Sequence, residues 1–164
     1  MDGGLRELLC FGVGCFLPAA VGAYADLKSG VIPDKATLPV ILAGLVYGLC
    51  TGHLWWGLVG FLAALALFGG AALAGGVGGG DLKLALGLGL WLGPFGFLWA
   101  VAVAGLSAFL YGAARKARKK ELRLWAWRFA TGAPVAGSEA VPFGPFLCLG
   151  ALASFLLSPG TLHS

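Results

Sequence analysis

Charged side chains are scarce in this sequence. Only 11% of the 164 residues are Asp, Glu, Lys or Arg, whereas 59% are hydrophobic. Soluble domains carry about 25% charged residues, so this composition cannot provide the surface of a water-soluble domain. We therefore predict an all-α, polytopic membrane helix bundle, with residues 1–164 forming a single membrane-embedded domain.

Clustered metal ligands are also missing. The four cysteines lie in apolar stretches without CxxC spacing, and the two histidines stand alone. A zinc site needs several closely spaced ligands, so we expect no metal and no other cofactor. The cysteines are better interpreted as small buried apolar residues. The residues concerned are Cys10, Cys15, Cys50, Cys148, His53 and His163.

A secretory leader is not indicated, although Ala23-Tyr24-Ala25 follows an apolar run and imitates a cleavage site. A signal peptide begins with net positive charge, whereas here Arg6 is offset by Asp2 and Glu7. We expect residues 1–25 to form a helix of the mature protein.

Six apolar stretches are candidates for transmembrane helices, each of which needs about 20 mostly apolar residues. Gly93 and Pro94 interrupt the fourth stretch, which can therefore be bent or only partly spanning. About six spans are predicted, and five remain an alternative. The stretches are 5–25, 36–51, 54–74, 82–97, 97–113 and 141–158, with loops near 26–35, 75–81 and 114–140.

Six spans distribute the basic residues very unevenly. Ten of the eleven Lys and Arg residues fall on one side, and only Arg6 falls on the other. The positive-inside rule makes the basic side cytoplasmic. The run Arg115–Arg128 is typical of a cytoplasmic anchor with interfacial tryptophans. Its sharper alternative is a surface for anionic lipid or an acidic partner, and no nucleic-acid-binding module accompanies it.

Asp26 and Asp81 stand at the cytoplasmic ends of the first and fourth spans in this topology. Asp81 alone could be a helix N-cap and Asp26 a loop carboxylate. Ionisable residues at membrane depth are costly and usually functional, however. Two carboxylates that converge from different helices are the pair that an aspartyl protease requires. The preceding glycine run is not a phosphate loop, because Asp81 follows where such a loop has Lys.

Three segments together resemble the type IV prepilin peptidase family. They are D-x(6)-P (Asp26 to Pro33), G-x-G-D followed by Leu-Lys-Leu (Gly78 to Leu84), and VPFGPF (Val141 to Phe146). They occur in the family's order, and the resemblance covers nearly the whole chain. It implies a six-helix GxGD-type aspartyl membrane protease.

The resemblance also implies roles for individual residues. Asp26 and Asp81 match the catalytic pair, and Asp34 is a weaker rival for the first position because the family often has asparagine there. Lys83 matches a basic residue of the motif, with a structural or tuning role. The predicted active-site or substrate loop contains Pro33, Asp34, Gly78, Gly80 and Lys83.

The activity implied by the resemblance is removal of the basic leader of type IV prepilins or secretion pseudopilins. The family cuts after a glycine at the cytoplasmic edge of the bacterial inner membrane, so the expected partners are this leader segment and membrane lipid. Many members also carry a domain with paired CxxC motifs that is associated with N-methylation. This sequence lacks it, which favours a peptidase-only member. The alternatives are a small ion- or proton-coupled transporter that uses the same aspartates, or a non-catalytic assembly subunit.

Overall fold

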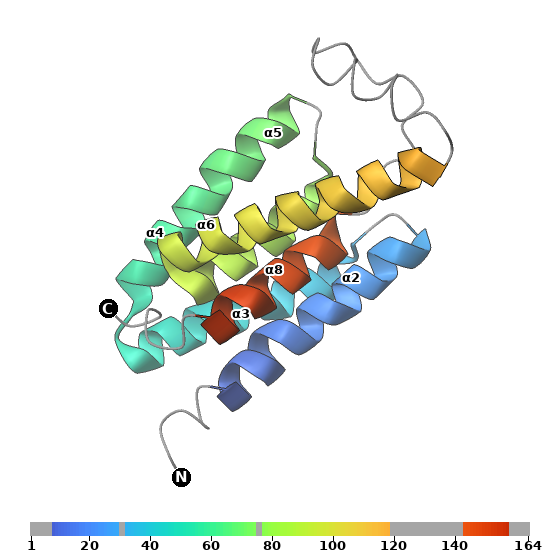
Figure 1. Cartoon of the computed structure of the whole chain (residues 1–164). Coiled ribbons are helices and arrows are strands. Elements are labelled where there is room, and N and C mark those ends of the chain that lie inside the picture. The colour runs from blue at the N-terminus through green and yellow to red at the C-terminus, as the bar shows by residue number, and fades with distance from the viewer. Residues whose placement is uncertain (1–7, 30–31, 75–76, 119–142, 158–164) are drawn as a thin grey trace.

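The computed structural model describes residues 8–29, 32–74, 77–118 and 143–157. Within these ranges all regular structure is helical and no strand occurs (Figure 1). The all-α prediction is therefore confirmed. Most of the predicted basic anchor, from residue 119 onward, lies outside the described residues, as do Val141 and Pro142 of the third motif.

Four helices among the described residues are long and apolar enough to cross a membrane. They are Leu8–Lys28, Asp34–Thr51, Leu54–Leu73 and Gly79–Arg115, and Gly144–Leu157 is a shorter apolar helix. Large apolar side chains such as Leu42, Trp55 and Leu62 are mostly exposed on the outside of the bundle. Exposed apolar area of this kind is costly in water but not against lipid tails. The prediction of a multi-pass membrane helix bundle is confirmed.

Helix boundaries follow the predicted spans within a few residues, and both the first helix and the helix Gly79–Arg118 extend further than predicted. The first helix continues to Ser29, so Asp26 lies within its last turn and not beyond its end. The elements are η1 (Gly12–Phe16) and α2 (Leu17–Ser29) in the first span, α3 (Asp34–Thr51) in the second, α4 (Leu54–Ala64), η2 (Leu65–Gly69) and α5 (Gly70–Leu73) in the third, then α6 (Gly79–Arg118) and α8 (Gly144–Leu157). Both η elements are π-helical turns inside otherwise continuous helices.

Helix α6 is two helices joined by a sharp reversal at Gly93. A straight helix of its 40 residues would be about 60 Å long, roughly twice the hydrocarbon core of a bilayer. Gly93 has φ 65° and ψ −177°, which only glycine adopts readily, and Pro94 follows. The break predicted at Gly93 and Pro94 is therefore present, and it ends the first arm of α6 before residue 97, the predicted boundary between the fourth and fifth spans.

Side-chain contacts show that α6 folds back along the bundle (Figure 1). Before the break it runs parallel to α3, since Lys83 bonds Asp34 and Trp91 stacks on Tyr47. After the break it runs antiparallel to α8: Ser154 bonds Gly96 near the reversal, whereas Tyr111 lies near Phe146 at the start of α8. The two arms of α6 therefore run in opposite directions along the bundle, and the number of membrane spans, six or five, stays a prediction.

One end of the bundle gathers several helix ends, and we call it the aspartate end. Helix α2 finishes there, α3, α6 and α8 begin there, and the second arm of α6 returns to it. Four of the described basic residues, Lys28, Lys35, Lys83 and Arg115, belong to helix turns at this end. The predicted concentration of positive charge on one side therefore agrees with the direction of the helices.

Candidate active site

Asp26 is held at the junction of α2 and α8. Its side chain is 7% exposed, and its Oδ2 accepts a hydrogen bond from the backbone N–H of Gly144 at 3.2 Å. The first N–H groups of a helix have no partner within the helix and carry partial positive charge, so a carboxylate is favourable there. Asp26 therefore caps α8, a helix that begins 118 residues later in the chain.

Gly144 lets α8 approach Asp26 this closely. A Cβ atom at this position would lie 3.0 Å from Asp26 Oδ2 and 3.2 Å from the end of the Ile32 side chain. Phe143 and Phe146 on either side pack near Phe68 and Tyr111, with ring centroids 6.0 and 5.6 Å apart. The described part of the predicted third motif, Phe143 to Phe146, thus orients the first aspartate.

Asp81 lies in the first turn of α6. Its Oδ1 atom is buried and has no hydrogen-bond partner among the described residues. The turn begins where Leu82 N–H donates to Gly78 O at 3.2 Å, so Gly78 ends the irregular segment before the helix. A buried carboxylate oxygen without a donor is costly in a structural role, whereas a reactive group needs such a free position.

The two aspartates come together although α2 and α6 are far apart in sequence. Ile32 lies between their helices, since its side chain meets the positions of Gly22 on α2 and Gly80 on α6. The same side chain also meets the position of Gly144, whose backbone N–H bonds Asp26, and Gly80 directly precedes Asp81. The structure therefore brings the predicted pair to one site at the aspartate end.

Gly80 is required by the contact between α6 and the segment before α3. A Cβ atom there would lie 2.8 Å from Ile32 Cβ and 3.3 Å from the Ile32 backbone N and O atoms. Carbon atoms without a bond between them prefer separations of about 3.5–4.0 Å. The residue before Asp81 must consequently be glycine if α6 is to keep its present position.

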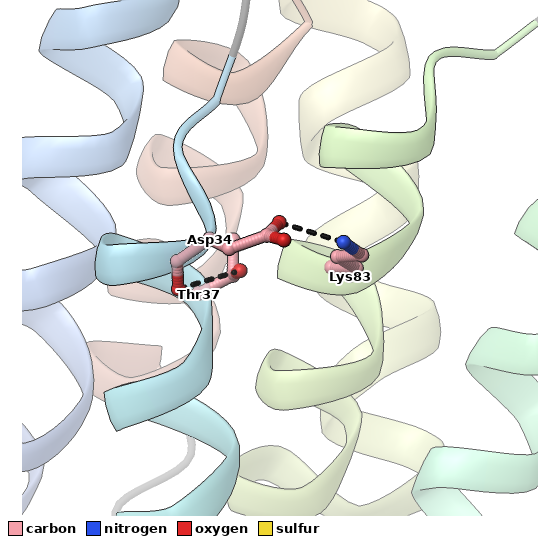
Figure 2. A network of polar contacts seen from close by, with 3 residues as sticks. All are labelled: Asp34, Thr37 and Lys83. Carbon is pink, nitrogen blue, oxygen red and sulfur yellow. Dashed lines mark hydrogen bonds and ion pairs between the residues drawn. The ribbon is translucent and has the colours of Figure 1, made fainter.

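Asp34 points toward Lys83 and pairs with it (Figure 2). The Lys83 Nζ atom lies 2.6 Å from Asp34 Oδ1, and the Lys83 and Asp34 side chains are 46% and 60% exposed. Pro33, the residue before α3, is extended, with φ −72° and ψ 142°, and delivers Asp34 to the first turn of that helix. Asp34 is thus engaged with a cation, whereas the buried Oδ1 atom of Asp81 has no hydrogen-bond partner in the described part of the chain.

Two residues beside the pair were not among the predicted site residues. Ile32 and Gly144 both contact the segments that carry the aspartates. Both lie inside motifs that the sequence does reveal, next to Pro33 and within FGPF. The residues that they contact are distant in sequence, and neither hydrophobic periodicity nor motif spacing predicts a contact between distant segments.

A helical membrane bundle with two carboxylates gathered at one end defines a polytopic membrane protein with a polar site. A family model described as the Type IV leader peptidase family matches residues 13–113, more than half of the chain. The chain therefore belongs to the type IV leader peptidase family, and its general function is that of a membrane leader peptidase. The matched region contains both Asp26 and Asp81. Searches of curated proteins and of solved structures gave no match.

Proposed function

We propose that this peptidase is an aspartyl endopeptidase whose catalytic pair is Asp26 and Asp81. The observation that carries the proposal is their meeting at the aspartate end, with Gly144 N–H on Asp26 and a free, buried oxygen on Asp81. Among the described residues no group of three or more His, Cys, Asp or Glu side chains could hold a metal ion. The family match supports peptide hydrolysis in general, and the aspartates supply a chemistry for it.

In the proposed mechanism the pair shares one proton and activates one water. One carboxylate takes a proton from the water as its oxygen attacks the scissile carbonyl carbon, and the other gives its proton to the carbonyl oxygen. The resulting gem-diol collapses, the C–N bond breaks, and the leaving nitrogen receives a proton from the pair. Gly144 N–H holds Asp26 in place throughout.

The proposed substrate is the leader of a type IV prepilin or pseudopilin, cut after glycine at the cytoplasmic edge of a bacterial inner membrane. Substrates of this kind join a polar leader to an apolar helix, and a site at the end of an apolar bundle can reach that junction. The basic residues at the aspartate end support a cytoplasmic orientation. A basic leader gains little attraction from this face, because Asp34 is already paired with Lys83.

The test is cleavage of a synthetic peptide that contains a basic leader, a glycine and an apolar helix, by the purified protein in proteoliposomes. Wild type should cut after the glycine, and both Asp26→Asn and Asp81→Asn should be inactive while retaining wild-type circular dichroism. Lys35→Ala, which removes an exposed charge on α3, is the matched control and should remain active. Retained cleavage by either folded aspartate variant would remove that residue from the mechanism.

The same proteoliposomes separate this proposal from the transporter alternative. A proton or ion pathway needs polar groups through the bundle. The described buried polar side chains other than Asp26 are Thr37 and Ser154, whose hydroxyls donate to the backbone oxygens of Asp34 and Gly96. We expect no proton flux that depends on Asp81. Flux without cleavage would favour the transporter.

A further inference from the structure

The ion pair between Asp34 and Lys83 joins the start of α3 to the start of α6 (Figure 2), and Asp81 belongs to the same first turn of α6. An exposed pair of this kind contributes little to folding stability. The same two segments are already joined by the buried contact between Ile32 and Gly80. The position of the pair next to a candidate catalytic group therefore suggests a role other than holding the fold together.

Lys83 is the cation nearest to Asp81 in the sequence, two residues further along α6. Residues two apart point to different sides of a helix, but the lysine stem is long and flexible. The ammonium is bound to Asp34 at 2.6 Å, while the buried Asp81 Oδ1 has no partner among the described residues. The ammonium of Lys83 is thus bound to Asp34 and not to Asp81 Oδ1.

An ammonium bound to Asp81 would interfere with the proposed chemistry. It would favour the ionised carboxylate, although the pair must share a proton, and it would occupy an oxygen that has to contact water. The carboxylate of Asp26, which reaches the same site through Gly144 and Ile32, would attract a released ammonium as well. A free Lys83 is therefore a potential internal inhibitor.

We propose that Asp34 is a positioning residue that sequesters Lys83 from the catalytic pair. This inference rests on the proposed function. It predicts an unusual pattern among variants: loss of Asp34 is harmful only while Lys83 is present. A role of Asp34 in folding or in binding the leader would not produce that pattern.

The experiment measures kcat and KM for peptide cleavage in proteoliposomes. Asp34→Ala should lower kcat at least about tenfold, with KM nearly unchanged. A tenfold change corresponds to a change of one pKa unit in the proton affinity of Asp81. Asp34→Asn should retain most activity, because its amide oxygen still accepts a hydrogen bond from Lys83. Lys83→Met should be clearly faster than Asp34→Ala, and the Asp34→Ala/Lys83→Met double variant should be as fast as Lys83→Met alone. Lys35→Ala again serves as the matched charge control.

Three outcomes would overturn the inference: a double variant as slow as Asp34→Ala, a Lys83→Met variant as slow as Asp34→Ala, or a rise in KM in place of a fall in kcat. If Asp34→Ala does not fold, Asp34→Ser carries the same comparison, since serine is well tolerated near a helix start. Absence of cleavage by wild type would refute the proposed function itself. Cleavage by wild type, without recovery of kcat in the double variant, would refute only the role of Asp34.

Discussion

Replacing Gly80 by alanine tests how tightly the position of Asp81 is set. The new Cβ would stand 2.8 Å from Ile32 Cβ, so the two segments must separate by about 0.7–1.2 Å to reach ordinary contact. The Ile32 backbone N and O atoms would lie 3.3 Å from the new Cβ, and backbone atoms cannot move aside as the end of a flexible side chain can. Overpacking of this kind costs about 1–3 kcal/mol of stability.

The larger effect of Gly80→Ala should be on catalysis, because Asp81 is the next residue. A misplacement of about 1 Å in a catalytic group can reduce the rate about 100-fold. We expect kcat to fall by about 10- to 100-fold, with a smaller change in KM. Peptide cleavage in proteoliposomes measures this, and thermal unfolding in detergent measures the accompanying loss of stability.

Gly79→Ala is the matched control for this prediction. It adds the same methyl group one residue earlier, where nothing lies within 4 Å of the new atom. Alanine is favoured over glycine in a helix by about 1 kcal/mol, so this variant should be active and at least as stable as wild type. Equal activity of the Gly79 and Gly80 variants would refute the argument that close approach to Ile32 positions Asp81.

Two further predictions concern the interior of the bundle. Gly93→Ala should destabilise the protein by about 1–3 kcal/mol, because Gly93 has φ 65° and a Cβ atom there would overlap Trp56. The control is Gly105→Ala, because nothing lies within 4 Å of a Cβ atom at Gly105. Equal unfolding temperatures of the two variants would contradict the prediction. Trp91→Phe should cost about 1–3 kcal/mol, because it removes the buried hydrogen bond from Trp91 Nε1 to Val40 O at 2.9 Å. Thermal unfolding measures this loss, while KM should stay unchanged; an unaltered unfolding temperature would show that the bond contributes nothing.

Much of the fold could be predicted because membrane helices are encoded locally. Each span must satisfy its own backbone hydrogen bonds in lipid, so a sufficiently long apolar stretch identifies a helix by itself. Gly93 and Pro94 identified the break in α6 for the same local reason, since neither residue continues a helix easily. Only the boundary between the fourth and fifth spans was misplaced, at residue 97 instead of Gly93, because the apolar pattern continues through the reversal.

The site could be predicted only in part. Asp26 and Asp81 are conspicuous as carboxylates at the ends of apolar stretches, and the predicted six-span topology places both of them on the same side of the membrane. The roles of Ile32 and Gly144 could not be predicted, because each depends on contacts between helices that are distant in sequence. The pairing of Asp34 with Lys83 across α3 and α6 is of the same kind.

The sequence by itself determined the class of protein, the approximate spans, the charged side and the two candidate aspartates, because hydropathy and charge act along the chain. Only the tertiary structure decided which groups those aspartates meet. The first N–H group of α8 donates a hydrogen bond to Asp26, and Lys83 forms an ion pair with Asp34. Among the described residues, the Oδ1 atom of Asp81 has no hydrogen-bond partner. These relations arise from packing between helices, where close approach is set by the shape of both partners and not by either segment alone.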